Sequence, residues 1–219
     1  MVRVPQQGTG LKLKRVHQLF SEALELDAEA QPRHNHCVHF EVIMLAYLFV
    51  LLAIAVRFLP HPLSFTPVAA ALLFFGARGP RRQIWMPLVL LAVSDVILTK
   101  AVYAYVFTWD QLVTWAWYAA ILWLGTKLHD NAKPLRVIGA ALASSVSFFL
   151  LSNLAVWAAF DMYPKNFAGV MESYAAGLPF FRRGIAGDLL FTTLMFATPV
   201  AIHALAGIFS KSSDRAAAA

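Results

Sequence analysis

The sequence predicts an all-α, polytopic membrane protein: a six-helix transmembrane bundle with cytoplasmic N- and C-termini and a short interfacial helix between spans five and six. Three observations predict this fold class. Of the 219 residues, 59% are hydrophobic and only 14% are charged, whereas a typical soluble domain has about 25% charged residues. The apolar residues form continuous runs of helical length rather than the short alternating segments of a barrel. The basic residues gather mainly on one side of the predicted spans, which indicates their orientation.

The composition also excludes several classes of protein. A soluble domain of this size buries only about 70% of the surface of its unfolded chain. With a mean hydropathy of +0.62, this chain would then expose much apolar surface to water. An ordinary cytosolic globule, a disordered chain and a disulfide-built secreted module are therefore excluded. The net charge of +6 would favour nucleic acid in a soluble protein. Here the basic residues set topology, and we expect no nucleic-acid partner.

The predicted domain organisation has three parts. Residues 1–38 form a cytoplasmic tail, in which residues 11–30 have the spacing of an amphipathic helix that is either solvated or lies on the membrane surface. Residues 39–210 form the six-helix transmembrane domain, and residues 211–219 a flexible C-terminal tail. The first ~35 residues are polar or amphipathic, unlike a cleavable signal peptide. We therefore expect the first span to remain in the protein.

Six apolar stretches account for the predicted spans, since a helix needs about 20 residues to cross the hydrocarbon of a membrane. They cover residues 40–59, 63–77, 84–99, 112–128, 135–160 and 184–209. The second stretch is short and begins among prolines. Residues 161–183, between the last two stretches, contain Glu172 and are too polar for a span. For this segment we expect a short interfacial or re-entrant helix.

The distribution of Lys and Arg supports six spans with both termini inside. Thirteen of the 18 basic residues fall on the predicted cytoplasmic side, in the N-terminal tail, the even-numbered loops and the C-terminal tail. The other side receives five, which are Arg57, Lys100, Lys165, Arg182 and Arg183. An excess of Lys and Arg in cytoplasmic loops is the usual determinant of orientation.

Two aspartates within the apolar stretches are the main candidates for function. An Asp at the centre of a membrane helix costs about 2.5–3.5 kcal/mol on insertion scales. With the predicted topology, Asp95 and Asp188 both lie in the outer half of the membrane. Asn153 and Trp157, one helical turn apart on one face, lie in the same half. Polar groups from separate segments at one depth indicate an outward-opening ligand pocket.

The predicted substrate-binding residues have distinct roles. Asp95 and Asp188 would make polar or charge contacts, Asn153 would donate or accept a hydrogen bond, Trp157 and Tyr174 would form apolar walls, and Arg183 would be an ion-pair or anion contact. Structural pairing is the alternative, with Asp95 paired to Lys100 or Arg57, and Asp188 to Arg183. The remaining Trp and Tyr residues between residues 103 and 123 are typical of an interfacial belt.

No motif for an enzyme, a cofactor or a metal is found in the sequence. His34, His36, Cys37 and His39 are ligand types that suit zinc or copper, but their spacing matches no zinc motif. The sequence has no phosphate-binding glycine loop, zinc-protease motif, nucleophile elbow or dinucleotide fingerprint. We expect that the chain is not an enzyme and has no cofactor or metal.

A family resemblance is carried by several short motifs. Residues 64–70 (SFTPVAA) running into 72–77 (LLFFGA) resemble the second-helix motif of a group of small bacterial integral membrane proteins assigned to transport. Ser94-Asp95, Phe148-Phe149 leading to Asn153 and Trp157, Tyr163-Pro164, and residues 179–182 (PFFR) followed by 187–190 (GDLL) resemble the same pattern. The layout is similar to that of the substrate-binding S components of energy-coupling-factor transporters. The resemblance covers approximately residues 60–206.

The resemblance implies an outward-facing site for a small water-soluble molecule, a separate cytoplasmic energising module, and a bacterial inner-membrane location. The leading hypothesis is therefore a membrane transport protein of the S-component type that binds a small polar solute. The alternative is a non-catalytic structural or accessory subunit of a larger membrane complex, which would dock through small residues on the fifth span and through the amphipathic tail.

Overall fold

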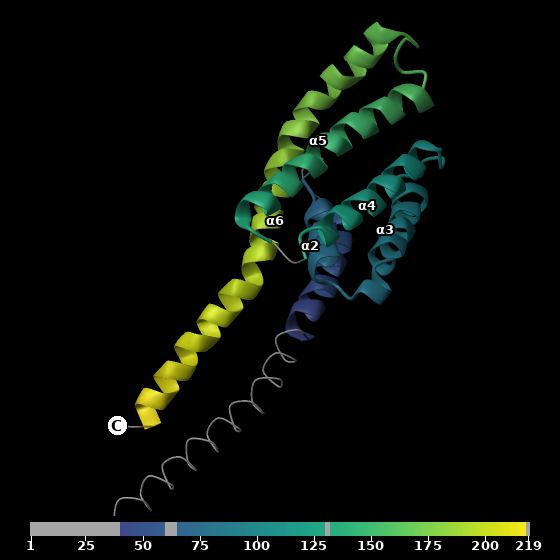
Figure 1. The fold of residues 1–219 in the computed structure, drawn as a ribbon. Coiled ribbons are helices and arrows are strands. Elements are labelled where there is room, and N and C mark those ends of the chain that lie inside the picture. Colours follow the sequence, from purple (N-terminus) through teal and green to yellow (C-terminus); the bar gives the residue numbers. More distant parts are fainter. Residues whose placement is uncertain (1–39, 60–64, 130–131, 218–219) are drawn as a thin grey trace, which may run out of the picture. The chain divides into compact units, whose positions relative to one another are not determined.

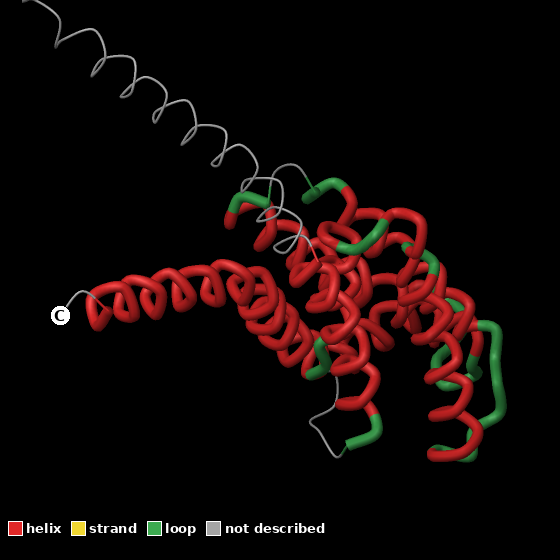
Figure 2. Tube along the Cα trace, turned by 90° about the horizontal axis from the view of Figure 1, so that it is seen from below, coloured by secondary structure: helices red, strands yellow, loops and turns green. Residues whose placement is uncertain are grey.

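The computed structural model describes residues 40–59, 65–129 and 132–217, and the side chains up to residue 208. Within these ranges the chain is helical, with turns between the helices and no strand (Figure 2). The all-α class is confirmed. The chain divides into two compact units, Met1–Glu41 and Val42–Ala219. Almost all of the first unit lies outside the described residues, as do the predicted amphipathic helix and the His34, His36, Cys37 and His39 run.

Six α-helices make up the described part of the chain (Figure 1). They are Phe40–Arg57, α2 (Val68–Arg78), α3 (Met86–Ile97), α4 (Asp110–Thr126), α5 (Pro134–Ala159) and α6 (Phe167–Ala217). A 3-10 turn, η1 (Arg81–Gln83), precedes α3, and a π-helical turn, η2 (Leu98–Val102), follows it. Proline near the first position begins both α3 and α5, where its missing N–H costs no hydrogen bond.

Helix α2 forms the centre of the hydrophobic core. Every residue from Val68 to Ala77 is buried. The ring of Phe74 packs edge-on against Phe49 of the first described helix at 5.0 Å and against Phe196 of α6 at 5.2 Å between centroids. Eleven residues extend only about 16 Å as a helix, about half of the ~30 Å of hydrocarbon. The second predicted span thus corresponds to a short, buried helix that packs against α4, α5 and α6, and its crossing of a membrane stays a prediction.

Four of the described helices are long and apolar enough to cross a membrane. They are Phe40–Arg57, Arg81–Val102, Pro134–Ala159 and Phe167–Ile208, and between 11% and 28% of each apolar window is buried inside the protein. Large apolar side chains such as Leu48, Val89 and Leu150 are 46–56% exposed. An exposed apolar surface of this extent indicates a membrane or another partner. Helix α4 has 17 residues, and the six-span topology with its interior termini stays a prediction.

The predicted separate helix between spans five and six is not observed. The residues assigned to it are the first part of α6, which runs without interruption for 51 residues. The side-chain Oδ1 of Asn166 accepts a hydrogen bond from the Gly169 N–H at 3.0 Å, as an N-cap does, and so starts this helix. Glu172, Arg182 and Arg183 are exposed, so the helix continues past them without burying their charges.

The C-terminal end of the chain also differs from the expectation of a flexible tail from residue 211. Helix α6 continues to Ala217 and includes Pro179 and Pro199. Proline inside a helix removes one hydrogen bond, but neither of these ends the helix. Figure 1 shows α5 and α6 side by side before the yellow end of α6 continues past α5.

Candidate functional site

A cavity of about 440 Å³ lies inside the bundle, and all six described helices contribute to its wall. Its lining residues are Arg57, Thr66, Val68, Ala69, Asp95, Leu98, Tyr103, Gln111, Thr114, Trp117, Tyr118, Ser145, Phe148, Phe149, Ser152, Asn153, Gly177, Phe180, Phe181, Gly184 and Asp188. Three of the six predicted site residues are among them: Asp95, Asn153 and Asp188. The chain thus brings these three together from α3, α5 and α6.

The first charged group of the cavity is an ion pair between Arg57 and Asp95. The Arg57 Nη2 contacts Asp95 Oδ1, and Nη1 donates a hydrogen bond to Ser94 Oγ at 3.0 Å. The second carboxylate oxygen of Asp95 accepts a hydrogen bond from Trp115 Nε1 at 3.0 Å. The Asp95 side chain is 1% exposed. Of its two predicted partners, Arg57 rather than Lys100 is the one observed, and both carboxylate oxygens are already used inside the protein.

The second charged group, Asp188, has a different environment. Its Oδ2 accepts a hydrogen bond from Ser145 Oγ at 2.6 Å. No basic side chain within the described ranges forms an ion pair with it. The predicted partner Arg183 is exposed and does not line the cavity. Residues five apart project from different faces of a helix, whereas ion pairs along a helix need a spacing of three or four.

Asn153 lies where α5 and α6 approach each other closely. Its Nδ2 donates a hydrogen bond to the Phe149 carbonyl at 2.7 Å. The amide oxygen Oδ1 is a hydrogen-bond acceptor only. Its backbone carbonyl accepts a hydrogen bond from Ser173 Oγ at 3.0 Å. Gly177 faces the amide, since a Cβ at Gly177 would collide with Oδ1 and lie 2.7 Å from Nδ2. The glycine therefore leaves the space that the Asn153 amide occupies.

Aromatic rings form much of the remaining wall. Phe149 of α5 stacks on Phe181 of α6 with 4.4 Å between centroids. Trp117 of α4 packs against Phe148 at 4.7 Å, and its Nε1 donates a hydrogen bond to Ser147 Oγ at 3.0 Å. An aromatic wall interrupted by a few polar groups is typical of small-molecule sites.

Comparison with known proteins places the chain in a family. A family model described as a family of unknown function (DUF6580) matches residues 39–207, which is most of the chain. The chain belongs to this family. All of the cavity-lining residues lie inside the matched region. No curated protein and no solved structure matches the chain significantly.

The other three predicted site residues of this DUF6580 member lie outside the cavity wall. Trp157 Nε1 donates a hydrogen bond to the Pro164 carbonyl at 2.8 Å, and the Tyr174 hydroxyl donates one to the Leu150 carbonyl at 3.1 Å. Both contacts fasten the hairpin between α5 and α6. Arg183 is exposed. None of these three side chains lines the cavity. Among the described residues, no group of three or more His, Cys, Asp or Glu could hold a metal ion.

Sequence reasoning did not identify several residues that define the site. Trp117 and Tyr118 are 5% and 4% exposed and line the cavity, whereas Tyr105 and Trp123 are 71% and 61% exposed. The aromatic cluster expected to form an interfacial belt therefore splits into a buried part and a surface part. Ser145, Phe149 and the predicted site residue Asn153 follow one another at intervals of four on α5 and all line the cavity. This spacing puts the three on one helix face, and it is the sequence signal that could have identified Ser145 and Phe149.

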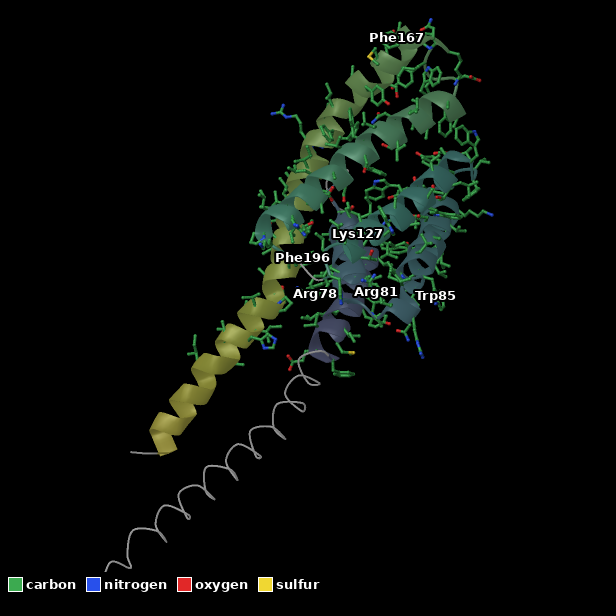
Figure 3. All side chains as sticks on the ribbon, in the orientation of Figure 1. Arg78, Arg81, Trp85, Lys127, Phe167 and Phe196 are labelled. Atoms are coloured by element: carbon green, nitrogen blue, oxygen red, sulfur yellow. The ribbon has the colours of Figure 1, made fainter. Side chains whose placement is uncertain are left out.

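Part of the cavity wall comes from ends of helices that the predicted topology puts on one side, while α5 and α6 contribute from their middle turns. Arg57 ends its helix, Thr66 precedes α2, and Gln111 begins α4. Figure 3 shows the basic residues Arg78, Arg81 and Lys127 on the side of the bundle away from Phe167. Arg78 ends α2 and Lys127 follows α4, whereas the cavity residues Thr66 and Gln111 lie at the opposite ends of these helices.

Proposed function

We propose that this chain is a membrane transport protein that binds a small polar solute in the cavity, in the manner of an S component. The observation that carries the proposal is the 440 Å³ cavity with Asp188 in its wall. Protein interiors are packed to about the density of organic crystals, so a purely structural bundle has no reason to keep such a space. Ligand sites commonly have volumes of about 300–1,000 Å³.

In this proposal the residues have separate tasks. Asp188 and Asn153 contact the solute, and the aromatic pair Phe149 and Phe181 covers its apolar part. The Arg57–Asp95 pair forms a fixed polar wall, because the two charges neutralise each other and both carboxylate oxygens have partners. Trp157, Tyr174 and Arg183 are assigned to the scaffold and the surface instead. Binding is the whole task of the chain, which would perform no bond chemistry and need no cofactor.

The setting proposed for this activity is the bacterial inner membrane. The apolar helices would contact the lipid bilayer, the cavity would open outward, and the basic side would face the cytoplasm. A separate energising module on the cytoplasmic side would supply the free energy for uptake. The support for this setting is that Arg78 and Lys127 lie at the ends of α2 and α4 opposite to the cavity residues Thr66 and Gln111, and that Arg78, Arg81 and Lys127 lie away from Phe167 (Figure 3).

A retained-solute experiment tests the proposal. The full chain is purified from its membrane in mild detergent, and mass spectrometry measures any small molecule that it retains. Ser152→Phe adds a ring to the cavity wall and is expected to lower the retained amount at least tenfold. Leu150→Phe places the same ring at a side chain of α5 that is 47% exposed, and is expected to leave retention unchanged.

Either of two results would contradict this function: no retained solute, or equal retention by Ser152→Phe and the wild type. Thermal unfolding of both variants checks that they are folded. An accessory subunit is the second candidate, because Val200, Leu205 and Ile208 on the last part of α6 are 54–70% exposed. Purification of a stoichiometric membrane complex that contains no solute would favour that function.

A further inference from the structure

We infer that the cavity selects a solute that carries a protonated amine, with the Asp188 carboxylate as its counter-ion. The inference rests on the proposed function and adds the chemical class of the solute. The charged side chains of the wall are one guanidinium, Arg57, and two carboxylates, Asp95 and Asp188. Since Arg57 pairs with Asp95, the wall carries one carboxylate without a cationic partner among the described residues.

Hydrogen-bond capacity points to the same class of solute. Arg57 donates to Asp95 and Ser94, and Asn153 Nδ2 donates to Phe149. These bonds use two of the five guanidinium N–H groups and one of the two amide N–H groups. The described contacts leave two acceptors without a donor, which are Asp188 Oδ1 and Asn153 Oδ1. The Thr and Gln side chains of the wall can both donate and accept. An ammonium group supplies N–H donors and no acceptor, so it can bond to both of these acceptors.

The positions of these groups along the helices bring them to one strip of the wall. Ser145, Phe149 and Asn153 follow one another at intervals of four on α5 and share a face. Gly184 and Asp188 have the same spacing on α6, and Phe181 lies two turns before Asp188 on that face. Two contacts join the α5 face to the α6 face: the hydrogen bond from Ser145 to Asp188 and the stack of Phe149 on Phe181.

The aromatic part of the strip favours a cation in a second way. The face of an aromatic ring attracts a cation within about 6 Å of its centroid. Phe148, Phe149, Phe180 and Phe181 line the cavity together with Asp188, so an ammonium ion paired with Asp188 would lie in an aromatic-lined space. An anion would meet the Asp188 carboxylate without an available cation, because Arg57 is already paired. Such like-charge contact disfavours acidic solutes.

Three probes of matched size separate charge from shape: 2-phenylethylammonium, 2-phenylethanol and 3-phenylpropanoate. Their affinities for the full chain in lipid nanodiscs are measured by calorimetry. The ammonium probe is expected to bind at least tenfold more tightly than the alcohol, and the carboxylate probe most weakly. In Asp188→Asn the advantage of the ammonium probe is expected to disappear. Asp161→Asn, which removes the same charge from a fully exposed side chain, is the control.

The outcomes separate this inference from the proposed function. Equal or tighter binding of the alcohol by the wild type would overturn the amine assignment, while binding in the cavity would stand. An undiminished preference for ammonium in Asp188→Asn would overturn the role of Asp188. If no probe binds, the retained solute decides: an amine supports the inference, and a neutral or acidic molecule refutes it. With no probe bound and no solute retained, the proposed function itself fails.

Discussion

Arg57→Ala is expected to lower the free energy of unfolding by about 3–5 kcal/mol. The guanidinium is the cationic partner of Asp95, whose side chain is 1% exposed. Removing one member of a buried ion pair leaves the other charge uncompensated in a medium of low dielectric constant. The hydrogen bond from Trp115 to Asp95 remains, but it cannot supply a full positive charge. Tryptophan fluorescence during thermal unfolding in detergent micelles would measure the loss.

A double variant supplies the control for this experiment. Arg57→Met with Asp95→Leu replaces the pair by apolar side chains of similar volume, and such replacements are often neutral or stabilising. We therefore expect the double variant to be much closer to the wild type than Arg57→Ala. Lys100→Ala removes the alternative partner of Asp95 and should have little effect. A large loss in Lys100→Ala, together with a small loss in Arg57→Ala, would refute the observed pairing.

Gly76→Ala is expected to destabilise the bundle by about 1–3 kcal/mol, the usual range for overpacking. At this position α2 and α4 meet through two glycines. A Cβ on Gly76 would lie 2.9 Å from the Gly125 Cα and would collide with the Leu122 carbonyl. A Cβ on Gly125 would lie 2.5 Å from the Leu73 carbonyl oxygen. These are backbone atoms, which cannot rotate away, so the two helices must separate.

Gly139→Ala is the matched control, since a Cβ on Gly139 meets nothing within 4 Å. Alanine is better than glycine in a helix interior by about 1 kcal/mol, so this variant should be as stable as the wild type or more stable. The unfolding midpoints of both variants in the same detergent measure the difference. Equal midpoints for Gly76→Ala and Gly139→Ala would show that α2 and α4 are not held in contact at these glycines.

The linear sequence predicted the helical segments well where hydrophobicity alone forms them. The stretches 40–59 and 135–160 correspond closely to Phe40–Arg57 and Pro134–Ala159, because a long apolar run has few alternatives to a helix. It was less informative for α2 and α6. A buried central helix and a membrane span have the same apolar composition, and length was the only difference. The charges of Arg182 and Arg183 suggested that one helix ends before residue 184 and another begins there. Both side chains are exposed, and an exposed charge does not end a helix.

For the site, the rarity of charge within apolar runs was the useful signal. It identified Asp95 and Asp188, and both line the cavity, while their contact with a solute stays a prediction. The same reasoning could not tell which aspartate forms an ion pair with a basic side chain. That difference depends on Arg57, which ends another helix 38 residues earlier, and on Ser145, an unremarkable serine among small residues.

The sequence by itself determined the apolar, helical character of this protein and the positions of its few embedded charges, because both follow from local composition and from the cost of burying charge. Only the tertiary structure decided which charges are paired, which aromatic residues enclose the cavity and which stretch becomes the core. The physical reason is distance: an ion pair, a ring stack or a glycine contact depends on atoms that packing brings together from helices far apart in the chain.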